Sequence, residues 1–183
     1  AIQASVEAGK QILDVYDKED VGIEYKDDNS PLTNADIRSN EAIMNILKPT
    51  QIPVLSEEGR DIQYAERKKW EYFWLVDPLD GTKEFVKRNG EFTVNIALVH
   101  NNTPILGVIF VPVLDELYFA HKELGSFYCP QVRNKAPYTV ANLTKASMQL
   151  PIEQSNGTYK VVGSRSHMSE ETMEYVENIK KTI

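Results

Sequence analysis

The stretch from Phe73 to Thr82 most constrains what this chain can fold into, because an apolar run ends there in two carboxylates. Residues 73–76 are continuously apolar and are followed by Asp77-Pro78-Leu79-Asp80-Gly81-Thr82. A short apolar run bounded by turn residues is typical of a strand buried on both faces. Pro78 fixes its own φ, and Gly81 tolerates backbone angles that other residues avoid. We therefore expect a buried strand that ends in a rigid turn.

Such a turn would aim Asp77 and Asp80 at one point and make them repel each other. At a separation of about 5 Å and an effective dielectric constant near 20, two such charges repel by roughly 3 kcal/mol. A proton, an arginine or a hard cation would offset this repulsion. We favour a cation.

Composition narrows the possible partners. The formal net charge of −7 argues against a nucleic-acid polymer as partner, but it leaves a small anionic substrate possible because bound metals invert the local field. Cys129 is the one cysteine, which favours a reducing compartment and hence the cytoplasm. Attachment to the inner membrane surface and homo-oligomerisation stay open. No apolar run approaches the ~20 residues of a membrane span.

Periodicity predicts an α+β fold with a largely antiparallel sheet. Apolar spacing and caps indicate helices over residues 1–18, 34–48 and 170–181, and Thr33 and Asp36 have the spacing of a capping pair. From Phe92 the apolar period changes to two, which is typical of strands. We expect strands over residues 21–26, 53–55, 73–76, 92–99, 105–111, 116–120, 126–128, 138–140 and 159–162. Residues 141–157 are polar and read as irregular.

Three carboxylates are candidates for one metal site. Glu57, Asp77 and Asp80 each follow a short apolar strand, and strand ends of one sheet lie near one another. Carboxylate oxygens without histidine or cysteine favour Mg²⁺ or Ca²⁺ over zinc. The backbone N–H groups of Gly81 and Thr82 could hold phosphate oxygens if they open a helical turn. A metal-dependent phosphatase, a structural Ca²⁺ site and a hydrogen-bonded acidic turn all remain possible from these residues.

Longer motifs carry a resemblance to a known family. Asp77-Pro78-Leu79-Asp80-Gly81-Thr82, with Phe85 three residues on, resembles the signature of the inositol-monophosphatase-like, lithium-sensitive phosphatases, and Ser56-Glu57-Glu58 resembles their upstream acidic motif. Residues 74–99, 29–36 and 164–167 are similar to one branch, the bacterial 3'(2'),5'-bisphosphate nucleotidases. The resemblance covers most of the chain.

The resemblance implies a role for each residue of the motifs. The residues matching Glu57, Asp77 and Asp80, with the backbone carbonyl matching Leu79, bind two or more Mg²⁺ ions in that family. The residue matching Thr82, hydrogen-bonded to the one matching Asp36, orients the attacking water. The substrate-binding residues that it implies are Glu57, Leu79, Asp80, Gly81, Thr82 and, in the segment near the nucleotide, Ser164 and His167.

The resemblance also implies a layered αβ sandwich of the inositol monophosphatase and sugar phosphatase type. Residues 1–140 would form the N-terminal α+β domain with the metal site, and residues 141–183 the start of a C-terminal α/β domain. The family carries a Trp-Asp-x-Ala-Ala motif farther downstream, which this sequence does not contain before Ile183. We therefore expect the C-terminal part to be truncated and this chain alone to be impaired.

The expected reaction is removal of the 3'-phosphate of adenosine 3',5'-bisphosphate, a by-product of sulfate activation, to give AMP and phosphate. Lys83-Glu84 after Gly81-Thr82 favours this reaction over that of an inositol monophosphatase, which is the alternative within the class. An alternative of another class is a non-catalytic fragment that binds metal or nucleotide.

Overall fold

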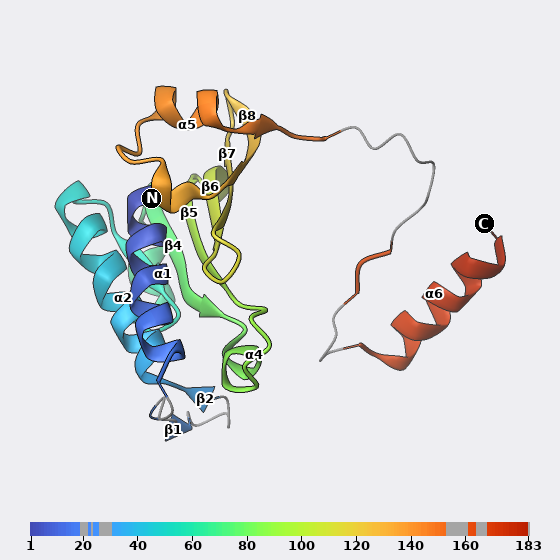
Figure 1. Cartoon of the computed structure of the whole chain (residues 1–183). Coiled ribbons are helices and arrows are strands. Elements are labelled where there is room, and N and C mark those ends of the chain that lie inside the picture. Colours follow the sequence, from blue (N-terminus) through green and yellow to red (C-terminus); the bar gives the residue numbers. More distant parts are fainter. Residues whose placement is uncertain (19–21, 23, 26–30, 153–160, 164–167, 183) are drawn as a thin grey trace. The chain divides into compact units, whose positions relative to one another are not determined.

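The structure is a computed structural model that describes residues 1–18, 22, 24–25, 31–152, 161–163 and 168–182 (Figure 1). It divides into two compact units, Ala1–Ile152 and Glu153–Ile183, and each is described by itself. The second unit contains helix α6 (Glu170–Thr182), whose first turn carries Glu170 and Glu171 and whose last turn carries Lys180 and Lys181. The Ser169 hydroxyl accepts the Thr172 N–H at 3.2 Å and so caps the start of this helix.

Two helices of the first unit form one layer, and a sheet forms the other (Figure 1). Helix α1 (Ile2–Tyr16) and helix α2 (Asn34–Leu47) pack against each other and against the middle of the sheet. Their apolar sides are buried at Ile12, Ile43 and Leu47, as expected for amphipathic helices that cover a sheet. Thr33 and Asp36 form a capping box at the start of α2, as predicted.

The sheet has seven strands in the order β3-β4-β5-β6-β7-β8-β9. Their bounds are β3 Val54–Ser56, β4 Tyr72–Asp80, β5 Thr93–His100, β6 Thr103–Val111, β7 Glu116–His121, β8 Gly125–Pro130 and β9 Met148–Gln149. β3 and β4 are parallel, and every other neighbouring pair is antiparallel. The α+β class and the largely antiparallel sheet are therefore confirmed. Asn101 and Asn102, both with positive φ, form a tight connection between β5 and β6.

The expectation that residues 73–76 are buried on both faces is wrong. Trp74 and Val76 are buried, but Leu75 is 46% exposed. The helices cover one face only, so Leu75, with Ile109 and Tyr118 farther along the sheet, lies on the other, open face. An apolar run cannot distinguish these cases, because exposed apolar side chains are common even in folded proteins.

The expected strand at residues 138–140 is also wrong. Thr139 accepts the Asn142 N–H at 3.3 Å and caps helix α5 (Val140–Ala146), so Val140 begins a helix instead. Residues 141–152, expected to be irregular, contain most of α5 and the edge strand β9. Because β9 pairs with β8, the first compact unit runs past residue 140 to Ile152. The division into two domains at residue 140 stays a prediction.

Short elements complete the described part. They are β1 (Glu24–Tyr25), β2 (Pro31–Leu32), α3 (Tyr64–Arg67) and α4 (Thr82–Val86). Of the strand expected at residues 21–26, residues 24 and 25 form β1, residue 22 has no regular structure, and the rest lies outside the described residues. Of the strand expected at residues 159–162, residues 161 and 162 have no regular structure and the rest lies outside the described residues. Among the described helices, none has the length and apolar content needed to cross a membrane.

Candidate metal centre

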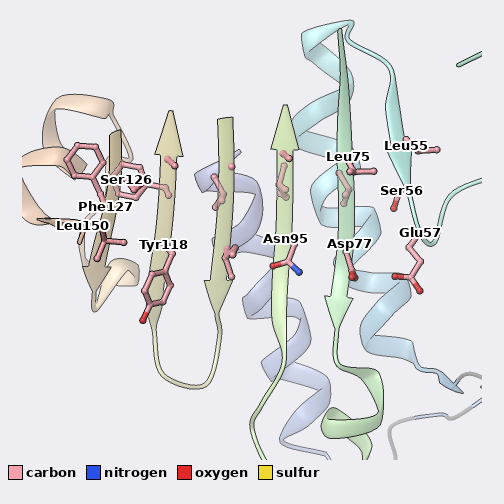
Figure 2. Close-up of a pocket in the computed structure, with 18 residues that line it drawn as sticks. Leu55, Ser56, Glu57, Leu75, Asp77, Asn95, Tyr118, Ser126, Phe127 and Leu150 are labelled. Atoms are coloured by element: carbon pink, nitrogen blue, oxygen red, sulfur yellow. The ribbon is translucent and has the colours of Figure 1, made fainter. Parts of the chain in front are cut away.

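The parallel pairing of β3 with β4 brings Glu57 next to Asp77. Ser56 is the register partner of Val76, so the residue after each lies at the same end of the pair. The Glu57 N–H donates to the Val76 carbonyl at 3.1 Å and extends this pairing by one residue. Figure 2 shows the Glu57 and Asp77 side chains at that end, with Asn95 of β5 beside them. Glu57 and Asp77, two of the three carboxylates predicted to converge, therefore lie at the same end of neighbouring strands.

Asp77 and Asp80 lie in an interrupted strand and not in a turn after it, which corrects the expectation from sequence. β4 continues to Asp80, and its register with β5 shifts between Asp77 and Asp80. Pro78, which lies inside this shift, has no N–H to donate to the ladder. The irregularity bends the strand locally and changes which way the following side chains point.

Asp77 is in an unfavourable environment for a lone carboxylate. Burial raises the pKa of Asp77 most, and the negative charges of Glu57 and Asp80 raise it further. A hydrogen bond from the Leu79 backbone lowers the pKa, which is about 7 as a result. Its Oδ1 atom is buried and has no hydrogen-bond partner in the described part of the chain. An orphaned buried acceptor among other carboxylates indicates a missing positive partner.

Asp36 and Thr82 meet beside this cluster. Asp36 is 1% exposed, and its Oδ2 accepts the Thr33 N–H at 2.8 Å and the Thr33 hydroxyl at 2.6 Å. Its Oδ1 lies 3.2 Å from the Thr82 hydroxyl oxygen. Burial raises the pKa of Asp36, while the hydrogen bonds from Thr33 and Thr82 lower it. Asp36 thus both caps α2 and contacts Thr82, so capping alone does not account for it.

Gly81 fixes the start of the helical turn that carries Thr82. It has φ +96° and lies directly before α4, which confirms the predicted helical turn. A Cβ at this position would lie 2.9 Å from the Glu91 carbonyl oxygen, so a larger residue would be strained and crowded. The turn also brings the Thr82 hydroxyl to 3.3 Å from the Leu79 carbonyl oxygen. Leu79 itself is buried.

Asn95 belongs to the centre, although the sequence analysis did not assign it a role. It is the register partner of Asp77, and its Nδ2 donates to Asp80 Oδ2 at 3.0 Å. The Thr93 hydroxyl in turn donates to Asn95 Oδ1 at 3.1 Å. This chain of hydrogen bonds sets the orientation of Asp80. Thr93 and Asn95 alternate with apolar residues along the strand that pairs with the aspartates. This alternation was the sequence signal that could have identified Asn95.

The donor set fits a hard divalent cation. It consists of carboxylate and carbonyl oxygens around the orphaned Asp77 Oδ1, which are the ligands that Mg²⁺ and Ca²⁺ prefer. The described residues contain no group of three His, Cys, Asp or Glu side chains already close enough to hold an ion. Mg²⁺ does not need such a group, because it commonly binds one or two carboxylates and keeps waters and substrate phosphate as its other ligands.

A groove of about 790 Å³ runs over the open face of the sheet from this centre. Glu57, Asp77 and Asn95 line its polar end, while Leu75 and Tyr118 are among the apolar and aromatic side chains that line the rest (Figure 2). The cluster is thus open to a ligand. Two further candidates for substrate contact, Ser164 and His167, lie outside the described residues.

Comparisons with known proteins agree with this geometry. The profile of the inositol monophosphatase family matches residues 1–182. The 3'(2'),5'-bisphosphate nucleotidase CysQ of Escherichia coli K12 is 41% identical over 186 residues, which cover 97% of this chain and 67% of the relative. The crystal structure of CysQ from Bacteroides thetaiotaomicron matches with a TM-score of 0.87 and 46% identity, over 100% of this chain and 67% of that one.

A more distant solved structure shows the fold alone. It is an IMPase/NADP phosphatase complexed with Mg²⁺ and phosphate, 23% identical with a TM-score of 0.53, and the match covers 58% of this chain and 41% of that one.

This chain spans about two thirds of the length of the CysQ relatives, and the family profile spans nearly all of this chain. The chain belongs to the inositol monophosphatase family.

Proposed function

We propose that this chain carries the active site of a Mg²⁺-dependent phosphatase that removes the 3'-phosphate of adenosine 3',5'-bisphosphate, giving AMP and phosphate. The observation that carries the proposal is the buried Asp77 Oδ1, which has no hydrogen-bond partner among the described residues and lies in a carboxylate beside Glu57 and Asp80. The Asp36–Thr82 pair lies next to it. The substrate class is supported by relatives 41% identical to this chain that are named 3'(2'),5'-bisphosphate nucleotidases.

In this proposal Glu57, Asp77, Asp80 and the Leu79 carbonyl would hold Mg²⁺, with two or more ions in the complete protein. Bound Mg²⁺ supplies Lewis-acid stabilisation of the phosphoryl oxygens and makes a coordinated water more acidic. Asn95 holds Asp80 in place for this task through the 3.0 Å hydrogen bond. Because the carboxylates come from two adjoining strands, their separation is set by the sheet.

Asp36 and Thr82 orient the attacking water. When the Thr82 hydroxyl donates to the Asp36 carboxylate, its lone pairs are left to accept a hydrogen bond from a water molecule. That hydrogen bond turns the water's own lone pair toward phosphorus, so the contribution is positioning, which dominates catalysis of phosphoryl transfer. The N–H groups of Gly81 and Thr82 would contact phosphate oxygens. Ser164 and His167 would contact the nucleotide.

The proposal includes the recycling of a sulfur-assimilation by-product, a small phosphate ester as partner and a cytoplasmic location. It includes sensitivity to lithium only if the second metal site is complete. Peripheral association with the inner membrane and homo-oligomer formation stay predictions.

The test is phosphate release by the purified chain from adenosine 3',5'-bisphosphate and from inositol 1-phosphate, each with Mg²⁺ and with EDTA. We expect Mg²⁺-dependent release from the nucleotide. Asp77→Asn should remove the difference between Mg²⁺ and EDTA. The matched control is Asp61→Asn, which changes an exposed carboxylate outside the centre and should leave the rate unchanged.

Each other outcome points to a different function. Release that is equal in Mg²⁺ and EDTA, or that survives Asp77→Asn, would refute the metal centre. Faster release from inositol 1-phosphate would make the chain an inositol monophosphatase. Mg²⁺ binding without release from either substrate would indicate a non-catalytic metal-binding protein.

A further inference from the structure

One face of α2 contacts three segments of the acidic centre, which are β3, β4 and the start of α4. Asp36, Ser39 and Asn40 are three and four residues apart, so they lie on the same side of the helix. Asp36 meets Thr82 at the start of α4, as described above. Ser39 and Asn40 contact β4 and β3, and neither has a role in the chemistry proposed so far.

Ser39 holds the irregular part of β4. Its hydroxyl donates to the Pro78 carbonyl at 2.6 Å, and the Ser39 side chain is fully buried. The Pro78 carbonyl and the Leu79 N–H belong to one planar peptide unit and point in opposite directions. The Leu79 backbone is the group that hydrogen-bonds to the Asp77 carboxylate. By fixing the Pro78 carbonyl, Ser39 therefore fixes the direction of the donor that orients Asp77.

Asn40 makes the equivalent contact with β3. Its Oδ1 accepts the Ser56 hydroxyl at 2.8 Å, and Ser56 directly precedes Glu57. The next link, from the Glu57 N–H to the Val76 carbonyl, ties this strand end to β4. Two neighbouring residues of one rigid helix thus hold the two strand ends from which Glu57 and Asp77 project.

We propose that Ser39 and Asn40 are positioning residues of the metal centre. They touch neither metal nor substrate, and they act through the Pro78 carbonyl and the Ser56 hydroxyl to fix the carboxylates of Asp77 and Glu57 relative to each other. This inference rests on the proposed metal centre. Loss of partners that orient metal ligands typically weakens metal binding by about 10–100-fold.

The test is direct binding of Mn²⁺, as a substitute for Mg²⁺, followed by electron paramagnetic resonance of the free ion. Ser39→Ala should weaken binding by about tenfold. The matched control is Ser5→Ala, which removes another fully buried serine hydroxyl, bonded to the Ile2 carbonyl at 2.9 Å within α1. It should leave Mn²⁺ affinity unchanged. Thermal unfolding in EDTA reports any loss of stability separately for both variants.

A second pair of variants covers the case in which Ser39→Ala does not fold. Asn40→Ala and Ser56→Ala should each weaken Mn²⁺ binding, and the double variant should be no weaker than the worse single one, because both remove the same hydrogen bond. Additive losses in the double variant would show that Asn40 does not act through Ser56 and would overturn its part of the proposal.

The outcomes separate this inference from the proposed function. If the unaltered chain binds Mn²⁺ and Asp77→Asn abolishes binding, but Ser39→Ala and Asn40→Ala bind as well as the parent, the positioning roles are wrong and the metal centre stands. If the unaltered chain binds no Mn²⁺, or if Asp77→Asn binds it normally, the metal centre is wrong and the positioning roles fall with it.

Discussion

Replacing Asp77 by Asn should stabilise the metal-free chain, although it removes a residue of the proposed active site. Burial and the charges of Glu57 and Asp80 raise the pKa of Asp77 to about 7 in the folded chain, against an ordinary value of 3.8. Between these values the folded chain binds a proton that the unfolded chain releases. Stability therefore falls as the pH rises from about 4 to about 7, and it is constant with respect to this group above 7.

The size of the effect follows from the same two values. At 1.36 kcal/mol per pKa unit, a rise from 3.8 to about 7 corresponds to about 4 kcal/mol of folding free energy lost at pH 8. The Asp77 side chain is partly exposed, and solvent screening reduces the expected loss to about 2 kcal/mol. Asp77→Asn removes the charge and keeps the shape, so it should recover about this amount above pH 7 and little of it near pH 4.

The assay is urea unfolding in EDTA, followed by tryptophan fluorescence at several pH values between about 4 and 8. The gain in unfolding free energy of Asp77→Asn over the parent should grow through this range and level off above pH 7. Asp61→Asn, at an exposed site, should show no such trend. With saturating Mg²⁺ the order should reverse, because the ion stabilises only a chain that binds it. A gain that is independent of pH would refute the reasoning.

Three other substitutions test the surroundings of the centre. Thr82→Val should leave Mn²⁺ affinity unchanged while phosphate release falls about a hundredfold, since it removes only the hydroxyl that orients water. Gly81→Ala should destabilise the chain by about 1–3 kcal/mol in urea unfolding, because of the positive φ and the Glu91 carbonyl. Gly9→Ala, whose Cβ would lie 2.3 Å from the Phe110 ring, should cost about 1–3 kcal/mol by overpacking but leave Mn²⁺ affinity unchanged.

The helices and the meander could be predicted from local signals. The Thr33–Asp36 spacing and the acidic first turn of α6 are properties of a few neighbouring residues, and the structure has both. The alternation after Phe92 predicted β5 because side chains of a half-buried strand point alternately to its two faces. Where a local signal was ambiguous, prediction failed. Thr139 reads equally well as a strand residue or a helix cap, and in the structure it caps α5.

The acidic residues of the centre could be predicted, but the groups that hold them could not. Glu57 and Asp77 stand out because charges directly after apolar strands are conspicuous. Ser39 looks like any serine in a helix, and its contact with Pro78 joins residues 39 positions apart. Such a bond depends on how α2 packs over β4, which is set by tertiary structure. The exposure of Leu75 depends in the same way on which sheet face the helices cover.

Conformational strain at the centre is possible because the packing around it is rigid. Three features of the centre are locally unfavourable: the φ of +96° at Gly81, the interruption of β4 and the burial of Asp77 Oδ1. Such features persist only where the surrounding structure holds them in place. Three residues after Thr82, the Phe85 ring packs against Tyr16 and Phe92, with ring centroids 5.0–5.3 Å apart among the three. Arg88 then donates to the Tyr16 carbonyl at the end of α1.

These contacts couple the stability of the core to the metal centre. The aromatic cluster fixes α4 against α1, and α2 fixes β3 and β4. Each of these three segments of the centre is therefore held in place by contacts with α1 or α2. A core change that loosens α4, such as Phe85→Leu, should therefore weaken phosphate binding at Gly81 and Thr82 more than Mn²⁺ binding at Asp77. A change on the α2 side, such as Ser39→Ala, should do the reverse. The two helical supports thus correspond to two separable parts of the proposed reaction, holding the phosphate and holding the metal.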